Sequence, residues 1–334
     1  MAPPTYADLG KSARDLFTKG YNFGFLKIDS TTRAGDKSEI EFKTTAAHNL
    51  VLVDDIENLK CENQGANKLG GNIDIKYKIP EREGEGHLGA SLRRNPATGR
   101  CKLSASARYR LRRHGITVTE KWNTDNVLGS VIEVNEQLGK GVKLTLDSTF
   151  VPATNKHALK LKTDYAHPTA RANLDVSLAT SPVILASSVF VHQGWLLGLA
   201  ANFDTATNKL TSSSLAFGRQ TGDYTLHSFV NNSTDFGFSL YHRVARNVEV
   251  GATAGWKRGA NAAATYALAA KYQPSKELVL RGKVDNESRV ALAATHSLSD
   301  DLKLTLSAQL GIGAAAANAD AHKFGLGFEY EPAN

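Results

Sequence analysis

The chain has 334 residues, a formal net charge of +7 and a mean hydropathy of −0.30. This length allows one large domain or two ordinary ones. No run approaches the roughly 18 consecutive apolar residues of a membrane-spanning helix, and the first residues resemble neither a secretory signal nor a cleaved presequence. The only cysteines, Cys61 and Cys101, exclude a disulfide framework and lack metal-ligand spacing. Composition alone therefore permits a soluble β-rich protein.

The first predicted element is a short amphipathic helix. Thr5 can cap it, and Asp8 follows three positions later, near the positive end of the helix. Apolar residues recur at helical spacing on one side, namely Leu9, Ala13, Leu16 and Phe17. The glycines of Gly20–Gly24 then provide a flexible hinge. We expect residues 1–24 to pack against a wall of strands, with a surface-lying helix as the alternative.

The rest of the chain repeats one pattern, segments of about ten residues with alternating hydrophobicity, separated by short turns rich in Gly, Asn, Asp and Ser. GITVTEKWN, at 115–123, is one such segment, with Ile116 and Val118 on its apolar face. Glu120 lies in phase with these two residues, where a carboxylate is unexpected. Either the strand bends or ends after Val118, which would leave Glu120 among the lipid headgroups, or the charge faces lipid.

Apolar-out, polar-in alternation over this length is typical of a transmembrane β-barrel, although a soluble sandwich also alternates. Two further features favour the barrel. Charged residues lie deep within the polar faces, as a water-filled interior allows. Aromatic residues lie near segment ends, as at membrane interfaces, and include Trp122, Phe150, Trp195, Phe203, Trp256, Tyr272 and Tyr330. Closure of the barrel also gives the backbone N–H and C=O groups of every strand a hydrogen-bond partner in lipid.

The sequence contains no common catalytic motif, and its ten histidines are dispersed. An enzyme is therefore not expected. A passive pore fits better, because a wide, positively charged interior favours anions through its field. Helix and wall cations would contribute together, namely Lys11, Arg14, Lys19, Lys143, Lys160, Lys162, Arg243, Arg281 and Lys303.

The chain resembles the voltage-dependent anion channel, the mitochondrial porin, along nearly its whole length. The matching segments are PPTYADLGKSARDLFTKGYNFG, VTEKWNTDN, GWLLG, LHSFVNNSTDFG, KLTLSA and HKFGLGFE. The resemblance implies an all-β membrane protein, a barrel of about 19 transmembrane strands with the helix inside the pore. It also implies a voltage-gated, weakly anion-selective pore for small ions and for ATP, ADP and phosphate in the mitochondrial outer membrane. The alternatives are a related mitochondrial protein-import pore and a soluble β-rich binding protein.

The same resemblance assigns site residues. It places ATP contacts at Lys11 and Lys19, and gating at Glu120, the family's membrane-facing glutamate. Arg14, Lys143 and Lys303 would add to selectivity. It places NAD contacts at Arg289, Val290, Ala291, Ser307, Ala308, Gln309, Leu310 and Gly311, although Arg289 replaces an apolar residue and Gly311 an acid. No cofactor is expected beyond regulatory ATP or NAD. Expected partners are membrane lipid, metabolite anions, further copies of the chain, and hexokinase-type and apoptosis-regulator proteins, but not nucleic acid.

Two segments depart from the family pattern, about 50–66 and 81–114, and interrupt the barrel expected over 25–334. Both cysteines fall within them. The second segment has nine Arg and Lys against three Glu. We expect both to be loops outside the wall. In the second, alternation from Cys101 to Leu111 leaves an added hairpin as the alternative.

Overall fold

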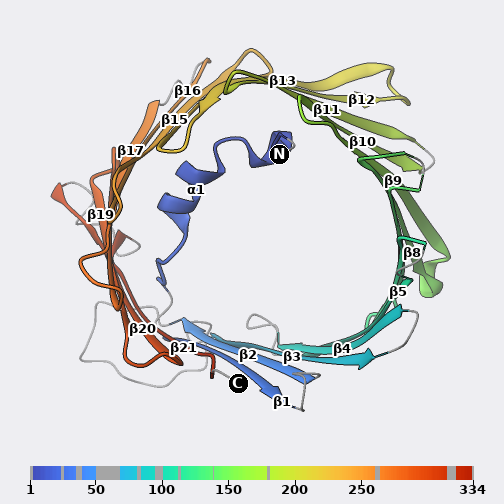
Figure 1. The fold of residues 1–334 in the computed structure, drawn as a ribbon, viewed down its shortest axis with the longest axis horizontal. Coiled ribbons are helices and arrows are strands. Elements are labelled where there is room, and N and C mark those ends of the chain that lie inside the picture. Colours follow the sequence, from blue (N-terminus) through green and yellow to red (C-terminus); the bar gives the residue numbers. More distant parts are fainter. Residues whose placement is uncertain are drawn as a thin grey trace.

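The computed structural model describes residues 3–23, 26–34, 40–49, 68–80, 84–94, 101–111, 114–137, 139–178, 181–259, 264–313 and 321–332. Its strands form one ring around a short helix (Figure 1). The helical elements are η1 (Tyr6–Asp8), α1 (Lys11–Thr18) and η2 (Pro152–Thr154). The strands are β1 (Leu26–Ala34), β2 (Ile40–Asn49), β3 (Lys68–Pro80), β4 (Gly84–Arg94), β5 (Cys101–Leu111), β6 (Ile116–Asn123), β7 (Leu128–Asn135), β8 (Val142–Val151), β9 (Lys156–Ala166), β10 (Ala170–Leu178), β11 (Val183–His192), β12 (Trp195–Asp204), β13 (Lys209–Gln220), β14 (Tyr224–Asn231), β15 (Asp235–Ala245), β16 (Val248–Lys257), β17 (Ala264–Tyr272), β18 (Leu278–Asp285), β19 (Arg289–Ser297), β20 (Leu302–Gly311) and β21 (Lys323–Tyr330).

The sheet closes on itself. Each strand pairs antiparallel with the next along the chain, so the order around the ring is the order of the sequence. The ring closes where β1 pairs β21 in parallel, with Leu26 opposite Leu326 and Ser30 opposite Tyr330. This leaves no free edge, which is the requirement for strands in lipid.

The apolar residues of the strands face outward, the reverse of a soluble domain. Leu268, Leu292 and Leu306 are 59%, 58% and 52% exposed on the outer face. A continuous apolar surface of this kind needs a nonaqueous neighbour, here the acyl chains of a bilayer. Trp122 and Trp256 lie near the ends of their strands, and Trp195 begins another, as predicted for interfacial aromatics.

The small apolar core lies inside the ring, between the amino-terminal segment and the wall. Leu9 packs there with Val189, Leu196 and Ala216. Ala13 and Leu16 of α1 are also buried. In the part of the chain that the structure describes, no helix combines the length and apolar character needed to cross a membrane.

The expectation that 81–114 forms a loop is wrong. Residues 84–94 and 101–111 are strands β4 and β5, paired from Gly84↔Leu111 to Arg94↔Cys101, and β5 also pairs β6. The hairpin accounts for the difference between the expected strand count of about 19 and the 21 strands observed. The other unusual segment, 50–66, lies outside the described residues.

Strand β6 does not end after Val118. It continues to Asn123, and Glu120 lies opposite Ala107 of β5 and Ser130 of β7. The alternation therefore continues through Glu120 and places its carboxylate on the outer face with Val118. This excludes a strand that stops short of Glu120.

Candidate functional site

The amino-terminal segment begins with a capped turn. The Thr5 hydroxyl donates to Asp8 Oδ2 at 2.6 Å and accepts from the Asp8 backbone N–H at 3.3 Å, as the predicted cap requires. The helix is not continuous, however, because Gly10 is left-handed (φ 67°) and separates η1 from α1. A Cβ added at Gly10 would lie 2.7 Å from Nδ1 of His227 on β14. Glycine is thus required there both by the turn and by the wall.

Two glycines of the wall let the segment lie close against it. A Cβ at Gly198 of β12 would come within 2.7 Å of Leu9 Cδ1, and one at Gly251 of β16 within 2.7 Å of Leu16 Cδ2. These contacts hold η1 against β11 and β12 and α1 against β15, β16 and β17. The opposite part of the ring, which includes β4 and β5, is not covered by the helix (Figure 1).

Cations of β18 cap the carboxyl end of α1. Lys283 Nζ donates to the Phe17 carbonyl and Arg281 Nη1 to the Lys19 carbonyl, each at 2.8 Å. The last carbonyls of a helix lack partners within it and carry partial negative charge, so cations are favoured here. This interaction adds a polar attachment of the helix end to the apolar contact of Leu16 with the wall.

The linker after the helix, residues 20–23, is attached to the wall at β18 and β20, next to the end of α1. The rings of Tyr21 and Phe23 stack with centroids 5.8 Å apart, and Lys283 Nζ lies 4.5 Å from the Tyr21 centroid. The Asn22 backbone N–H donates to Ser307 Oγ of β20 at 3.0 Å. Burial raises the pKa of the Tyr21 hydroxyl to about 12. Residues 20–23 are therefore a packed connection, rather than the freely flexible hinge that the glycines suggest.

The helix cations predicted to attract anions are compensated locally. Lys11 Nζ is 3.2 Å from Asp8 Oδ1 and Lys19 Nζ is 2.7 Å from Asp15 Oδ2. Arg14 donates to the Ala7 carbonyl. Hydrogen bonds from Thr5 and from Lys11 lower the pKa of Asp8. Lys11 and Lys19 are 57% and 65% exposed, so both stay available to a ligand although each has an acidic neighbour.

The predicted wall cations lie on the inner face. Lys143 Nζ is 3.4 Å from Glu133 Oε1, and Lys162 Nζ is 3.7 Å from Asp147 Oδ2. Lys303 of β20 is exposed. Lys143 and Lys162 lie on the paired strands β8 and β9, whereas Lys303 lies apart from them on β20. Within the described residues, no group of three or more His, Cys, Asp and Glu could hold a metal ion.

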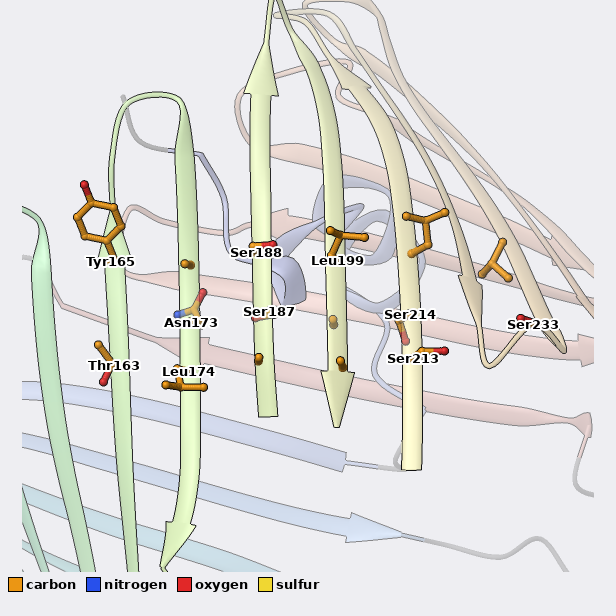
Figure 2. A pocket seen from close by; sticks show the side chains of 16 residues that line it. Thr163, Tyr165, Asn173, Leu174, Ser187, Ser188, Leu199, Ser213, Ser214 and Ser233 are labelled. Carbon is orange, nitrogen blue, oxygen red and sulfur yellow. The ribbon is translucent and has the colours of Figure 1, made fainter. Parts of the chain in front are cut away.

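A pocket lies across β9 to β14 on the outer face of the wall, on the other side from the amino-terminal segment, and the side chains that line it are mostly small (Figure 2). Leu174, Leu199 and Leu215 contribute its apolar part. Its lining includes none of the residues assigned to nucleotide contacts. The pocket therefore offers no cation for an anionic ligand.

The two segments expected to contact NAD are brought together, but three of the eight assigned positions face outward. β19 pairs β20 with Arg289 opposite Gly311, Ala291 opposite Gln309 and Ala293 opposite Ser307. By alternation Val290, Ala308 and Leu310 belong to the outer face, so they cannot contact a ligand in the pore. On the inner face, Ser307 is 5% exposed and already binds the linker. Arg289 is paired with Asp285 at 2.8 Å and with Glu287 at 2.7 Å.

Glu120 lies on the outer face, as one of the two alternatives for this strand requires. Its carboxylate is exposed, and Oε2 accepts a hydrogen bond from the Ser130 hydroxyl at 2.6 Å. This one hydrogen bond meets only part of the hydrogen-bonding capacity of a carboxylate in an apolar setting.

Sequence reasoning did not identify two parts of the pore lining. Lys283 went unnoticed because alternation assigns a residue to a face without showing what it contacts across the interior. Arg108 and Arg110 fall in the segment expected to be a loop, although their alternation with Ala107 and Tyr109 indicates the hairpin that was the alternative.

Comparison with known proteins agrees with this architecture. Residues 2–325 match the eukaryotic porin family. A probable voltage-dependent anion-selective channel of Caenorhabditis elegans is 56% identical over 334 residues, covering 100% of both chains. The non-selective voltage-gated ion channels VDAC2 of Meleagris gallopavo and VDAC1 of Homo sapiens are each 37% identical, covering 98% of this chain and 94% and 99% of their own. The chain therefore belongs to the eukaryotic porin family.

Proposed function

We propose that the chain is a voltage-gated, weakly anion-selective pore of the mitochondrial outer membrane, which passes small ions and metabolite anions such as ATP, ADP and phosphate. The observation that carries this proposal is the closed barrel with an apolar outer face, a charged inner face and a charged helix inside. The channel names of the relatives support it. A β-barrel of this size has no need of snug coordination sites, so its selectivity comes from the field of its lining.

Voltage sensitivity follows from the helix. Lys11, Arg14, Asp15 and Lys19 lie inside the transmembrane field, and each elementary charge moved across 100 mV contributes about 2.3 kcal/mol. The polar contacts that hold the helix end and the linker are at Arg281, Lys283 and Ser307, in addition to the apolar packing along the segment. We propose that voltage acts on this segment against those contacts.

Metabolite anions would interact with Lys11 and Lys19, which are exposed at opposite ends of α1. At the inner face of β19 and β20, NAD would contact the side chains of Arg289 and Gln309. The other assigned residues would form the paired strands that hold these two side chains in place. Membrane lipid on the outer face, further copies of the chain, and hexokinase-type and apoptosis-regulator proteins are the partners we propose.

Planar-bilayer recording of the refolded chain tests the proposal. In a KCl gradient we expect the sign of the reversal potential to show a preference for chloride over potassium. We also expect the channel to close at high voltage of either sign. Lys11→Glu, Arg14→Glu and Lys19→Glu together should shift the reversal potential toward cation preference. As a control, Lys209→Glu lies at the end of β13, away from the helix, and should shift it less. An absence of channels, or a cation-selective wild-type pore, would overturn the proposal.

A further inference from the structure

The added hairpin gives the pore a second basic surface, across the ring from the helix. The order of strands around the barrel places β5 about half a turn from β16, against which α1 packs. In Figure 1 the helix lies against the β15–β19 side, and β4 and β5 lie on the far side. An anion that passes the helix therefore passes between these two surfaces.

Alternation fixes which side chains of the hairpin face inward. Residues opposite each other in adjacent strands share a face. Arg108 is opposite His87 and Thr119, and Arg110 is opposite Glu85 and Thr117. The outward positions between them are Ala107 and Tyr109, in line with Val118 of β6.

Lys102, Arg108 and Arg110 of β5, with Lys121 of β6, form what we call the β5–β6 basic face. Lys121 is opposite Ser106, so the four cations form a row along β5 from one end of the strand to the other. Inward-facing positions two residues apart are separated by about 7 Å along the strand. An anion moving along the pore would thus meet a new cation at nearly every step.

Contacts between side chains confirm that the hairpin is part of the pore lining. Arg108 Nη2 lies 4.0 Å from Glu133 Oε2 on β7, reaching past β6, and Glu133 also contacts Lys143 of β8. Lys102 Nζ lies 2.6 Å from Asp125 Oδ2, in the turn after β6. Glu133 is thus shared by two cations, and the hairpin and its neighbouring strands form one charged lining.

The basic face is open to the aqueous interior, unlike the wall beneath the amino-terminal segment. The Lys102 and Arg108 side chains are 53% and 54% exposed. By contrast, Ser239, close to Gly10, and Ser307, bonded to the linker, are 8% and 5% exposed. Arginine is suited to this role because its planar guanidinium can donate two parallel hydrogen bonds to a phosphate.

We propose that the β5–β6 basic face is a contact site for permeating anions that carry several phosphates, and that Arg108 and Arg110 are its specificity-determining residues. The proposal rests on the anion pore proposed above and adds a site for multivalent anions to it. A monovalent anion contacts one cation at a time, whereas a polyphosphate spans two neighbouring steps of the row. The face thus favours multivalent anions beyond what average lining charge would do.

The test uses the full chain in planar bilayers, with inorganic tripolyphosphate as the probe in 0.1 M KCl. Tripolyphosphate should reduce the chloride current of the wild-type pore, and Arg108→Gln with Arg110→Gln should raise the half-effective concentration about three- to tenfold. Lys156→Gln with Lys209→Gln removes the same charge from the wall, at the ends of β9 and β13, and serves as the matched control, with a change of less than about twofold. The conductance of each variant in 1 M KCl shows that the barrel has formed.

Two complementary variants keep the test decisive. Ser104→Arg with Ser106→Arg adds two cations to the same face and should lower the half-effective concentration, even if the glutamine variant fails to insert. Arg108→Lys with Arg110→Lys retains the charge and should lose only part of the effect. Equal changes in the hairpin and control variants, or none in either, would overturn the site while leaving an anion-selective pore intact. A wild-type reversal potential toward cations would instead reject the proposed function.

Discussion

Deleting the added hairpin should narrow the pore by a calculable amount. Removing 81–114 would join β3 to β6 and reduce the barrel from 21 strands to 19. Taking a strand spacing of about 4.8 Å and a tilt of about 40°, the diameter at the backbone falls from about 42 Å to about 38 Å. With about 5 Å of wall on each side and a helix about 10 Å across, the open cross-section falls by about a quarter.

The assay is single-channel conductance in 1 M KCl, where the Debye length of about 3 Å suppresses differences in surface charge. We expect the deletion variant to conduct about three quarters as much as the full chain. The matched control keeps both strands and replaces Lys102, Arg108 and Arg110 with Gln, so it loses charge but not width. Its conductance at this salt concentration should equal that of the wild type.

A deletion variant with wild-type conductance would refute the reasoning, since it would mean that β4 and β5 do not contribute to the circumference. A loss of conductance in the glutamine control as large as in the deletion would also refute it. In that case charge, rather than strand number, would set the conductance.

Three further predictions concern the helix and the outer face. Gly198→Val should place a methyl against Leu9, at a cost of about 1–3 kcal/mol, and expose the amino-terminal segment to trypsin in detergent. Gly222→Val, where nothing lies within 4 Å, should leave proteolysis unchanged. The pKa of Asp8 is lowered by its hydrogen bonds, so the stability it contributes is present above its ordinary value of 3.8 and lost as the pH falls through the folded pKa. A spin label at Ala7→Cys, with Cys61 and Cys101 replaced by Ser, should become more mobile only when the pH falls through the folded pKa of Asp8. An equal gain in mobility on acidification in Asp8→Asn would contradict this. Glu120→Gln should abolish labelling by an apolar carbodiimide in bilayers, whereas Glu133→Gln should not; labelling of wild-type Glu120 by water-soluble reagents alone would rule out a lipid-facing carboxylate.

Much of the barrel could be predicted because period-two alternation is a local signal. Leu302, Leu304 and Leu306 specify an outer face whatever strand lies beside them, and β20 is where the sequence places it. The hairpin shows how a correct local signal can be outweighed. The alternation of 101–111 was visible, but departure from the family pattern favoured a loop. Free backbone edges are costly in lipid, and this favours pairing of an alternating segment that adjoins the wall.

The site was less predictable because it depends on contacts between distant segments. Lys283 and Phe17 are separated by 266 positions in the sequence, yet Lys283 caps the helix. Similarly, no local pattern shows that Ser307 binds the linker instead of a nucleotide. Alternation does show that Val290 and Leu310 face outward, since each lies between inward-facing neighbours. The assigned nucleotide residues can therefore be divided by face from the sequence alone.

The parallel pair β1–β21 restricts how such a barrel can change in size. Because the two end strands run in the same direction, the chain enters the ring at one rim and leaves it at the other. A single extra strand would make the closing pair antiparallel and carry the carboxyl terminus to the opposite side of the membrane. An inserted hairpin preserves the direction of every later strand, the side on which each turn emerges and the position of both termini. Diameter can therefore be changed in steps of two strands without altering orientation in the membrane, and the β4–β5 junction is a natural place to add or remove such a step in an engineered nanopore.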